Sequence, residues 1–219
     1  MRLNKFIAQA SGLSRRVADQ AIVAGRVKVN GSAPSLAQNI SGKDVVTLDD
    51  KPLNLPENLQ TVVLNKPVGY VCSRDGQGSK TIYELLPKKL HHLKPVGRLD
   101  KNSSGLLLLT NDGNLAHELT HPKFQKSKVY KIALNKPFKP ADLTAIQKGV
   151  RLEDGLSRLE LERINNTDDT NWKVIMSEGR NRQIRRTFDA LGYNVVKLHR
   201  THFGTYVLGD LKIGEFTDV

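Results

Sequence analysis

The chain has 219 residues, of which 38% are hydrophobic and 26% are charged, and it carries a formal net charge of +12. This composition is typical of globular proteins and excludes a disordered chain, while the positive charge favours a polyanionic partner, with nucleic acid as the first expectation. The single cysteine, Cys72, excludes an intramolecular disulfide, and no apolar run is long enough for a signal peptide or a bilayer span. We therefore expect a soluble, cytoplasmic protein without membrane partners.

The first predicted elements are two short helices. Apolar residues recur at helical spacing from Leu3 to Ala10, and Gly12 breaks this pattern. Ser14 then offers a side-chain oxygen as the N-cap of a second helix, whose apolar residues lie within residues 17–22. Gly25 is a typical helix terminator. We expect both helices to pack in one small N-terminal domain.

A hairpin and a linker are predicted next. Residues 26–31 alternate like a strand, with a tight-turn signal at Asn30-Gly31, and residues 45–48 can supply the partner strand. The segment 50–60 contains two prolines and shows no periodicity, which indicates a linker. These boundaries predict a small N-terminal domain over residues 1–55 and a larger domain over residues 60–219.

The larger domain alternates short strands with a few short helices. The expected helices are PADLTAIQKG (140–149) and NRQIRRTFDALG (181–192), and the expected strands are TVVLN (61–65), GLLLLT (105–110), KVYKIAL (128–134), LSRLELERI (156–164), WKVIM (172–176) and NVVKLHR (194–200). Many strands with few long crossovers predict an α+β domain with a mixed, mostly antiparallel sheet and a central cleft.

Basic residues concentrate in two segments. Residues 1–30 contain one acidic residue, Asp19, and six basic ones, which we expect to bind RNA: Arg2, Lys5, Arg15, Arg16, Arg26 and Lys28. Arg15 and Arg16 lie in the first turn of a helix, where positive charge opposes the helix dipole and an RNA phosphate would relieve the conflict. The alternative is that both arginines simply face water. The second segment, residues 177–204, also places arginines at a helix start, where they should find RNA phosphates or a protein carboxylate.

Asp100 is the candidate catalytic carboxylate. It follows a glycine-arginine turn, precedes an aliphatic strand, and has Arg98 and Lys101 close by in sequence. A positive setting favours the ionised form, which suits a nucleophile or an electrostatic stabiliser. From composition alone, a surface turn aspartate paired with a neighbouring arginine is the favoured alternative, because such aspartates are common.

Five segments resemble known RNA-modifying families. The segment RLNKFIAQASGLSRRVADQAIVAGRVKVNG resembles the alpha-L RNA-binding motif, over roughly the first fifty residues. Four further segments, in the family's order, resemble pseudouridine synthases of the branch that modifies single ribosomal sites: LNKPVGYVCS, GRLDKNSSGLLLLTNDG, KSKVYKI and SEGRNRQIRRTFDALGYNVVKLHR. The combined resemblance spans nearly the whole chain.

The resemblance implies a role for particular residues. Asp100 would be the catalytic aspartate, Tyr130 would stack against the target base, and Arg185 would pair with Asp100. Leu198 would close the apolar side of the base pocket, and Arg98 would enter the RNA stack when the uridine leaves it. The remaining substrate contacts implied by the motifs are Lys66, Arg182 and Arg186.

The resemblance also implies an activity. The enzyme would isomerise one uridine of ribosomal RNA, with 23S rRNA of the large subunit favoured over 16S rRNA. Its partner would be ribosomal RNA or an assembly intermediate of the ribosome, and it would act as a monomer without metal or other cofactor. The alternative function is a non-catalytic assembly factor that binds rRNA.

Two further features of the sequence are typical of other chemistries. Residues 117–121, HELTH, fit the zinc pattern H-E-x-x-H, in which His117 and His121 would bind zinc beside Glu118. Pro122 should end the helix there, and so short a pattern often arises by chance, so we do not expect a metal site. Cys72 has no base among its sequence neighbours, so we expect a buried apolar role rather than a thiol nucleophile.

Overall fold

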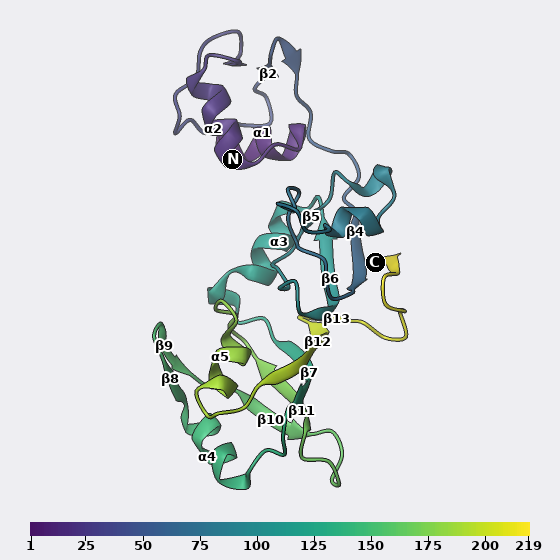
Figure 1. Ribbon diagram of the computed structural model, residues 1–219. Helices are drawn as coiled ribbons and strands as arrows, with labels where there is room; N and C mark the ends of the chain where they lie inside the picture. Colours follow the sequence, from purple (N-terminus) through teal and green to yellow (C-terminus); the bar gives the residue numbers. More distant parts are fainter. The chain divides into compact units, whose positions relative to one another are not determined.

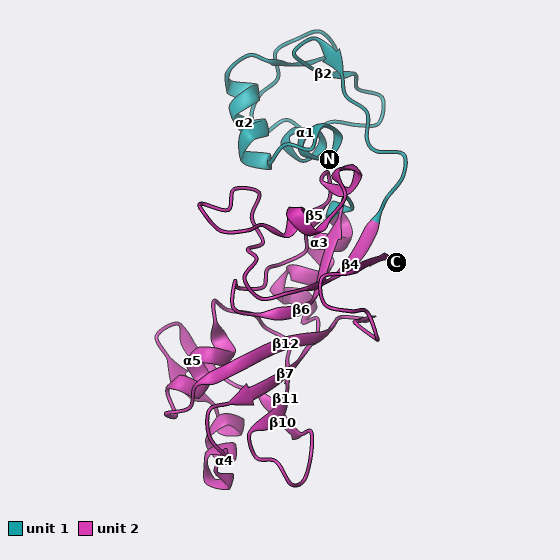
Figure 2. Ribbon diagram, turned by 45° about the vertical axis from the view of Figure 1, so that its right-hand side comes forward, with its two compact units in different colours: residues 1–60, 111–113 teal, residues 61–110, 114–219 magenta.

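The computed structural model describes all 219 residues, and Figure 1 shows the course of the chain. Contacts divide the chain into two compact units, which Figure 2 colours separately. The first unit comprises Met1–Gln60 with Asn111–Gly113, and the second comprises Thr61–Thr110 with Asn114–Val219. No helix combines the length and the apolar character needed to cross a membrane.

The first unit begins with two helices, as its sequence predicts. Helix α1 spans Leu3–Ser11 and ends where Gly12 adopts a φ of 78°, in the left-handed region that glycine enters at little cost. Helix α2 spans Arg15–Val23, and the Ser14 hydroxyl accepts a hydrogen bond from the Val17 amide at 3.2 Å. The predicted N-cap is confirmed.

Three short strands complete this unit, in the antiparallel order β1 (Val27–Val29), β2 (Val46–Leu48) and β3 (Lys51–Pro52). Asn30 and Gly31 make the predicted turn with φ values of 50° and 81°. Strand β3 contradicts the linker prediction for its two residues, because their backbone pairs with β2. The core of the unit joins both helices to the strands through buried apolar residues: Leu3, Ile7, Ala18, Ala21, Ile22, Val27, Val29, Ile40 and Val46.

A nine-stranded mixed sheet forms the second unit. Its main path runs β10-β11-β7-β12-β6-β4-β14, while β5 pairs with β6 and β13 with β12. Every pairing is antiparallel except that of β12 with β6, which confirms the predicted mixed, mostly antiparallel sheet. The strands span Thr61–Lys66 (β4), Lys94–Pro95 (β5), Ser104–Thr110 (β6), Lys128–Leu134 (β7), Glu160–Arg163 (β10), Asn171–Met176 (β11), Val195–Phe203 (β12), Tyr206–Val207 (β13) and Phe216–Asp218 (β14).

Strand β6 is buried along its whole length. Leu107 and Leu109 belong to the larger core, whereas Leu106 and Leu108 belong to a second cluster with Leu119 and other apolar residues. Successive side chains of a strand point to opposite faces of a sheet. The unbroken run of leucines is therefore explained by apolar cover on both faces of β6.

Three helices lie in the second unit, except that the first residue of α3 belongs to the first unit: α3 (Gly113–Thr120), α4 (Pro140–Lys148) and α5 (Gln183–Asp189). Single 3-10 turns occur at Ile82–Leu85, Lys88–Leu90 and Pro122–Phe124. The segment LSRLELERI is not the single strand that its pattern predicts. It divides between β10 and β9 (Gly155–Ser157), and β9 pairs with β8 (Val150–Leu152) in a separate hairpin. The buried hydroxyl of Ser157, the last residue of β9, forms a hydrogen bond with that of Thr187 of α5 at 2.8 Å.

Candidate active site

Asp100 lies on a tight turn between β5 and β6, and a buried lysine holds that turn. The Ser103 amide donates to the Asp100 carbonyl at 3.0 Å. Lys66, at the end of β4, donates from Nζ to the Asp100 carbonyl at 3.1 Å, to Ser103 O at 2.8 Å and to Pro67 O at 3.0 Å. An ammonium group has three donors, so all of them are used. The end of β4 therefore fixes the backbone from which the Asp100 carboxylate projects.

The burial of Lys66 corrects one expectation. Its side chain is 0% exposed, so it cannot touch RNA as the implied substrate contact requires. Burial lowers the pKa of its ammonium group, and the charges of Cys72 and Asp100 partly oppose that change. Lys66 acts inside the protein, as a support for the Asp100 turn.

Two arginines of the α5 region approach the Asp100 turn. Arg182 Nη1 lies 3.7 Å from Asp100 Oδ2. Arg185 donates from Nη2 to the Asn102 carbonyl at 2.7 Å and from Nη1 to the Val195 carbonyl. Burial and then the charge of Arg182 lower the pKa of Arg185, and Asp100 partly opposes this. The guanidinium beside the Asp100 carboxylate is thus that of Arg182, whereas Arg185, expected to make this pair, binds the backbone of the turn.

Tyr130 and Leu198 lie on neighbouring strands. Each is 8% exposed and belongs to the main core. In the register of β7 against β12, Tyr130 is opposite Arg200 and Leu198 is opposite Ile132. Arg200 in turn is opposite Gly105 on β6, the strand that follows the Asp100 turn. The sheet therefore brings the tyrosine strand within two strands of the turn, although no hydrogen bond links Tyr130 to Asp100.

The residues just before Asp100 are also anchored. The Cys72 thiol donates to the Leu99 carbonyl at 3.3 Å, and the Leu99 amide donates to Cys72 Sγ at 3.4 Å. Burial raises the pKa of the Cys72 thiol, which disfavours the nucleophilic thiolate. Cys72 therefore serves as a packing partner of the turn. Arg98 differs, because its side chain is exposed and forms no ion pair.

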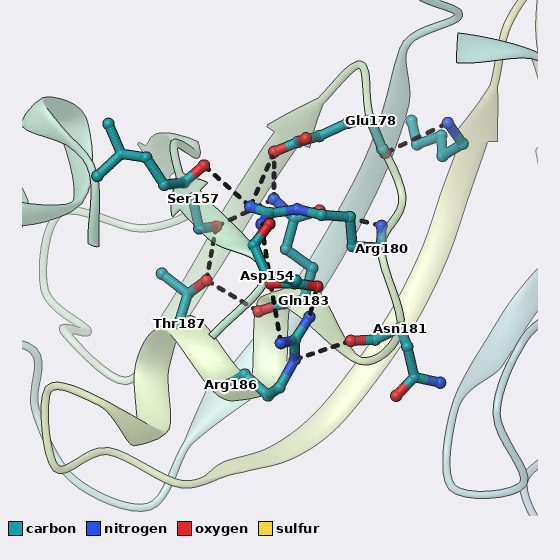
Figure 3. A network of polar contacts seen from close by, with 10 residues as sticks. Asp154, Ser157, Glu178, Arg180, Asn181, Gln183, Arg186 and Thr187 are labelled. Carbon is teal, nitrogen blue, oxygen red and sulfur yellow. Dashed lines mark hydrogen bonds and ion pairs between the residues drawn. The ribbon is translucent and has the colours of Figure 1, made fainter. Parts of the chain in front are cut away.

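A polar network surrounds the start of α5 (Figure 3). Arg186 makes a two-pronged contact with the carboxylate of Asp154, at 2.7 and 3.0 Å, and also donates to the Asn181 carbonyl at 2.9 Å. Arg180 contacts the same carboxylate at 2.9 Å and the carbonyls of Asp154 and Leu156, each at 2.9 Å. Arg186, expected to contact substrate, is therefore held by a carboxylate of the protein itself.

Sequence reasoning missed Asp154 and Arg200. Asp154 lies in a Glu-Asp-Gly turn, and only its fold connects it with arginines about thirty residues later. Arg200 is 2% exposed, donates from Nε to Leu106 O at 2.8 Å and stacks over the ring of Phe203 at 4.8 Å. Its place among the alternating residues of NVVKLHR was the available signal, because it shares the buried face with Leu198.

Five of the six basic residues expected to bind RNA fall into two groups. Arg26 pairs with Asp49 at 2.8 Å and Lys28 with Asp50 at 2.8 Å. No carboxylate pairs with Arg2, Arg15 or Arg16, all of which are exposed, and Arg15 donates only to the Asn4 side chain at 3.3 Å. The unpaired arginines are thus the ones that remain available to an anion.

The side chains of the HELTH segment contact one another and a neighbouring lysine. Helix α3 ends at Thr120, as Pro122 predicts, and the rings of His117 and His121 meet edge to face at 4.7 Å. Glu118 pairs with Lys126 at 2.6 Å. No three side chains of His, Cys, Asp or Glu gather in a way that could hold a metal ion.

Comparisons with known proteins place the chain in a family. The family model for RNA pseudouridylate synthase matches residues 60–190, and that for the S4 domain matches residues 1–46. A solved structure described as a pseudouridylate synthase is 39% identical, has a TM-score of 0.73, and aligns over 100% of this chain and 96% of its own.

Relatives carry names from both ribosomal subunits. Ribosomal small subunit pseudouridine synthase A of Haemophilus influenzae is 39% identical, with 99% of this chain and 94% of that protein covered. Ribosomal large subunit pseudouridine synthase B of Xylella fastidiosa is 37% identical over 100% of this chain, which spans only 48% of that longer protein. The corresponding large subunit protein of Bacillus subtilis is 36% identical, with 98% and 90% covered. With more than half of its residues matched by the family model, the chain belongs to the RNA pseudouridylate synthase family.

Proposed function

We propose that this protein isomerises a uridine of ribosomal RNA to pseudouridine, with Asp100 as the catalytic carboxylate. The observation that carries the proposal is the Asp100 turn, in a chain that belongs to the family. Lys66 holds the backbone of the turn, Arg182 lies 3.7 Å from the carboxylate, and Arg185 binds the Asn102 carbonyl of the same turn. A carboxylate fixed in position and flanked by cations is suited to act on a neutral base or its sugar.

The reaction needs few groups. The bond from the sugar to nitrogen 1 of the base breaks, the base rotates, and carbon 5 bonds to the same sugar carbon, while a proton leaves carbon 5 and nitrogen 1 gains one. Atoms and electrons balance without an oxidant, a reductant or a group donor. The base must first leave the RNA stack, which costs a few kcal/mol. Stacking on Tyr130, apolar cover from Leu198 and insertion of Arg98 into the vacated stack would offset that cost.

The N-terminal domain, residues 1–55, would supply affinity for structured RNA while residues 60–219 perform the chemistry. The exposed and unpaired Arg2, Arg15 and Arg16 support this division, because they can contact phosphates without breaking an internal ion pair. Two relatives are named for the large subunit and one for the small subunit. We favour 23S rRNA as substrate, with 16S rRNA as the alternative, either free or in an assembly intermediate.

The decisive experiment compares wild type with Asp100→Asn. Pseudouridines are mapped in rRNA from cells that lack the gene and are complemented with either form. We expect one site to disappear without the gene, to return with wild type, and to stay absent with Asp100→Asn, whose affinity for rRNA should equal that of wild type. Asp210 is an exposed aspartate that forms no ion pair, so Asp210→Asn is the matched control and should restore the site. An unchanged pseudouridine map, together with rRNA binding, would instead favour a non-catalytic assembly factor.

A further inference from the structure

The β8–β9 hairpin places one carboxylate between two arginines of the α5 region. Strands β8 and β9 are joined by the two-residue turn Glu153-Asp154, so Asp154 lies at the tip of the hairpin. Its carboxylate accepts from Arg180 Nη1 at 2.9 Å and from Arg186 Nη1 and Nη2 at 3.0 and 2.7 Å. Figure 3 shows both guanidinium groups converging on it. Charged two-pronged contacts of this kind are stronger and more directional than single hydrogen bonds.

The two arginines flank Arg182 in the sequence. Arg182 is the N-cap of α5, and its backbone has a φ of 46°, in the left-handed region that non-glycine residues rarely adopt. Its side chain makes no capping hydrogen bond. A conformation of this kind persists only where the surroundings impose it.

Contacts on both sides of Arg182 in the sequence hold its backbone conformation. Arg180 binds the hairpin through Asp154 and the Leu156 carbonyl. Arg186 binds Asp154 and, in addition, the carbonyl of Asn181, the residue directly before Arg182. Gln183 completes the arrangement, because its side chain accepts from the Arg180 amide at 3.1 Å and donates to Ser157 of β9 at 3.0 Å. The segment that carries Arg182 is thus tied to the hairpin before it and after it.

We propose that Asp154 is a positioning residue for the reaction: it fixes the strained start of α5 and thereby holds the Arg182 guanidinium beside Asp100. Asp154 itself does not touch Asp100 or any reacting atom. Its effect passes through Arg180 and Arg186 to the backbone at Arg182. This inference rests on the proposed function, because the expected change in rate presupposes pseudouridine formation at Asp100.

A double-mutant cycle tests the inference. Asp154→Asn keeps the shape of the side chain and removes its charge. It should lower the single-turnover rate of pseudouridine formation by on the order of tenfold, because small misplacements of a catalytic group have large effects on rate. The dissociation constant for the rRNA substrate should stay within about twofold, since no RNA contact is removed. In an Arg182→Gln background the same substitution should change the rate by less than about twofold, because the group through which it acts is absent.

A control variant and a second measurement distinguish failure of the positioning role from failure of the proposed function. Glu162→Gln breaks an ion pair of similar exposure, to Lys173, between strands β10 and β11, and should leave the rate unchanged. Amide hydrogen exchange of the free protein should accelerate in residues 178–186 in Asp154→Asn and not in Glu162→Gln. Equal rate losses in both Arg182 backgrounds, or unchanged exchange in residues 178–186, would overturn the positioning role. A wild-type protein that makes no pseudouridine would overturn the proposed function, and the exchange result would still decide whether Asp154 holds this segment.

Discussion

Two helices in this protein begin in arginine-rich sequence, and the structure uses the arginines in different ways. At the start of α2, Arg15 and Arg16 are exposed and have no carboxylate partner. Around α5, Arg180 and Arg186 are bound by Asp154, and Arg185 is bound by two backbone carbonyls. Positive charge at a helix start opposes the helix dipole, as at Arg15, Arg16 and the N-cap Arg182, whereas Arg186 lies in the last turn of α5, where the dipole favours it. An arginine cluster is therefore evidence for RNA contact only where no carboxylate or carbonyl of the protein already binds its arginines.

The largest predicted effect is a loss of rate in Arg182→Gln, which would distinguish the arginines around α5 from those at the start of α2. Arg182 is the α5 arginine nearest to Asp100. Its loss should reduce the single-turnover rate on the order of 10²-fold, because the carboxylate loses the group that orients it. RNA affinity, measured by filter binding, should change by less than about threefold, because one phosphate contact at most is lost. Arg163→Gln, which removes an arginine of β10 paired with Asp169, is the control. A large loss of affinity with an unchanged rate would place Arg182 in the same class as the α2 arginines.

The opposite pattern is expected for α2. The double variant Arg15→Gln/Arg16→Gln should raise the dissociation constant for rRNA on the order of tenfold and reduce the slope of log affinity against log salt by about two. Its rate at saturating RNA should equal that of wild type. The matched variant Arg26→Gln/Lys28→Gln alters residues that already pair with Asp49 and Asp50, so it should weaken binding less. If the paired residues mattered more than the unpaired ones, the distinction drawn from ion pairing would be wrong.

The smallest predicted effect is on the free energy of unfolding at low pH. Hydrogen bonding to Arg186, aided by the charges of Arg180 and Arg186, lowers the pKa of Asp154 from its ordinary value of 3.8. The unfolded chain therefore binds this proton more readily than the folded protein. The stabilisation is complete above pH 3.8 and is lost as the pH falls through the folded pKa. Urea unfolding should show a shallower loss of stability below that pH in Asp154→Asn than in wild type. If the free energy of unfolding fell equally steeply with pH in both proteins, the contacts of Asp154 with Arg180 and Arg186 would not depend on its charge.

The sequence pattern predicted those parts of the fold that depend on interactions between residues close together in the chain. The spacing of Leu3 and Ile7, the Ser14 cap and the Asn30-Gly31 turn each depend on a few neighbouring residues, and the structure confirms them. The segment LSRLELERI was predicted wrongly as one strand because its beginning pairs with β8 and its later residues pair with β11, and a local pattern does not specify pairing partners. The candidate site rested on resemblance rather than on pattern, since nothing around Asp100 distinguishes it from a surface aspartate by composition.

Long-range pairing accounts for what the sequence could not predict. The complete burial of Lys66 depends on carbonyls more than thirty residues away, at Asp100 and Ser103. The partner of Arg186 is Asp154, and the residue nearest to the Asp100 carboxylate is Arg182 rather than Arg185. Such choices are set by the packing of the hairpin against α5, for which a single sequence carries no periodic signal.

The position of β12 in the sheet has a consequence for the order of assembly during synthesis. β12 lies between β6 and β7, although it follows both in the chain by more than sixty residues. Until it emerges from the ribosome, β6 and β7 have no strand to join them, and each presents an unpaired edge. The turn that carries Asp100 and the strand that carries Tyr130 can therefore belong to one sheet only after β12 has been made. A nascent chain that lacks β12 has not yet assembled the proposed active site.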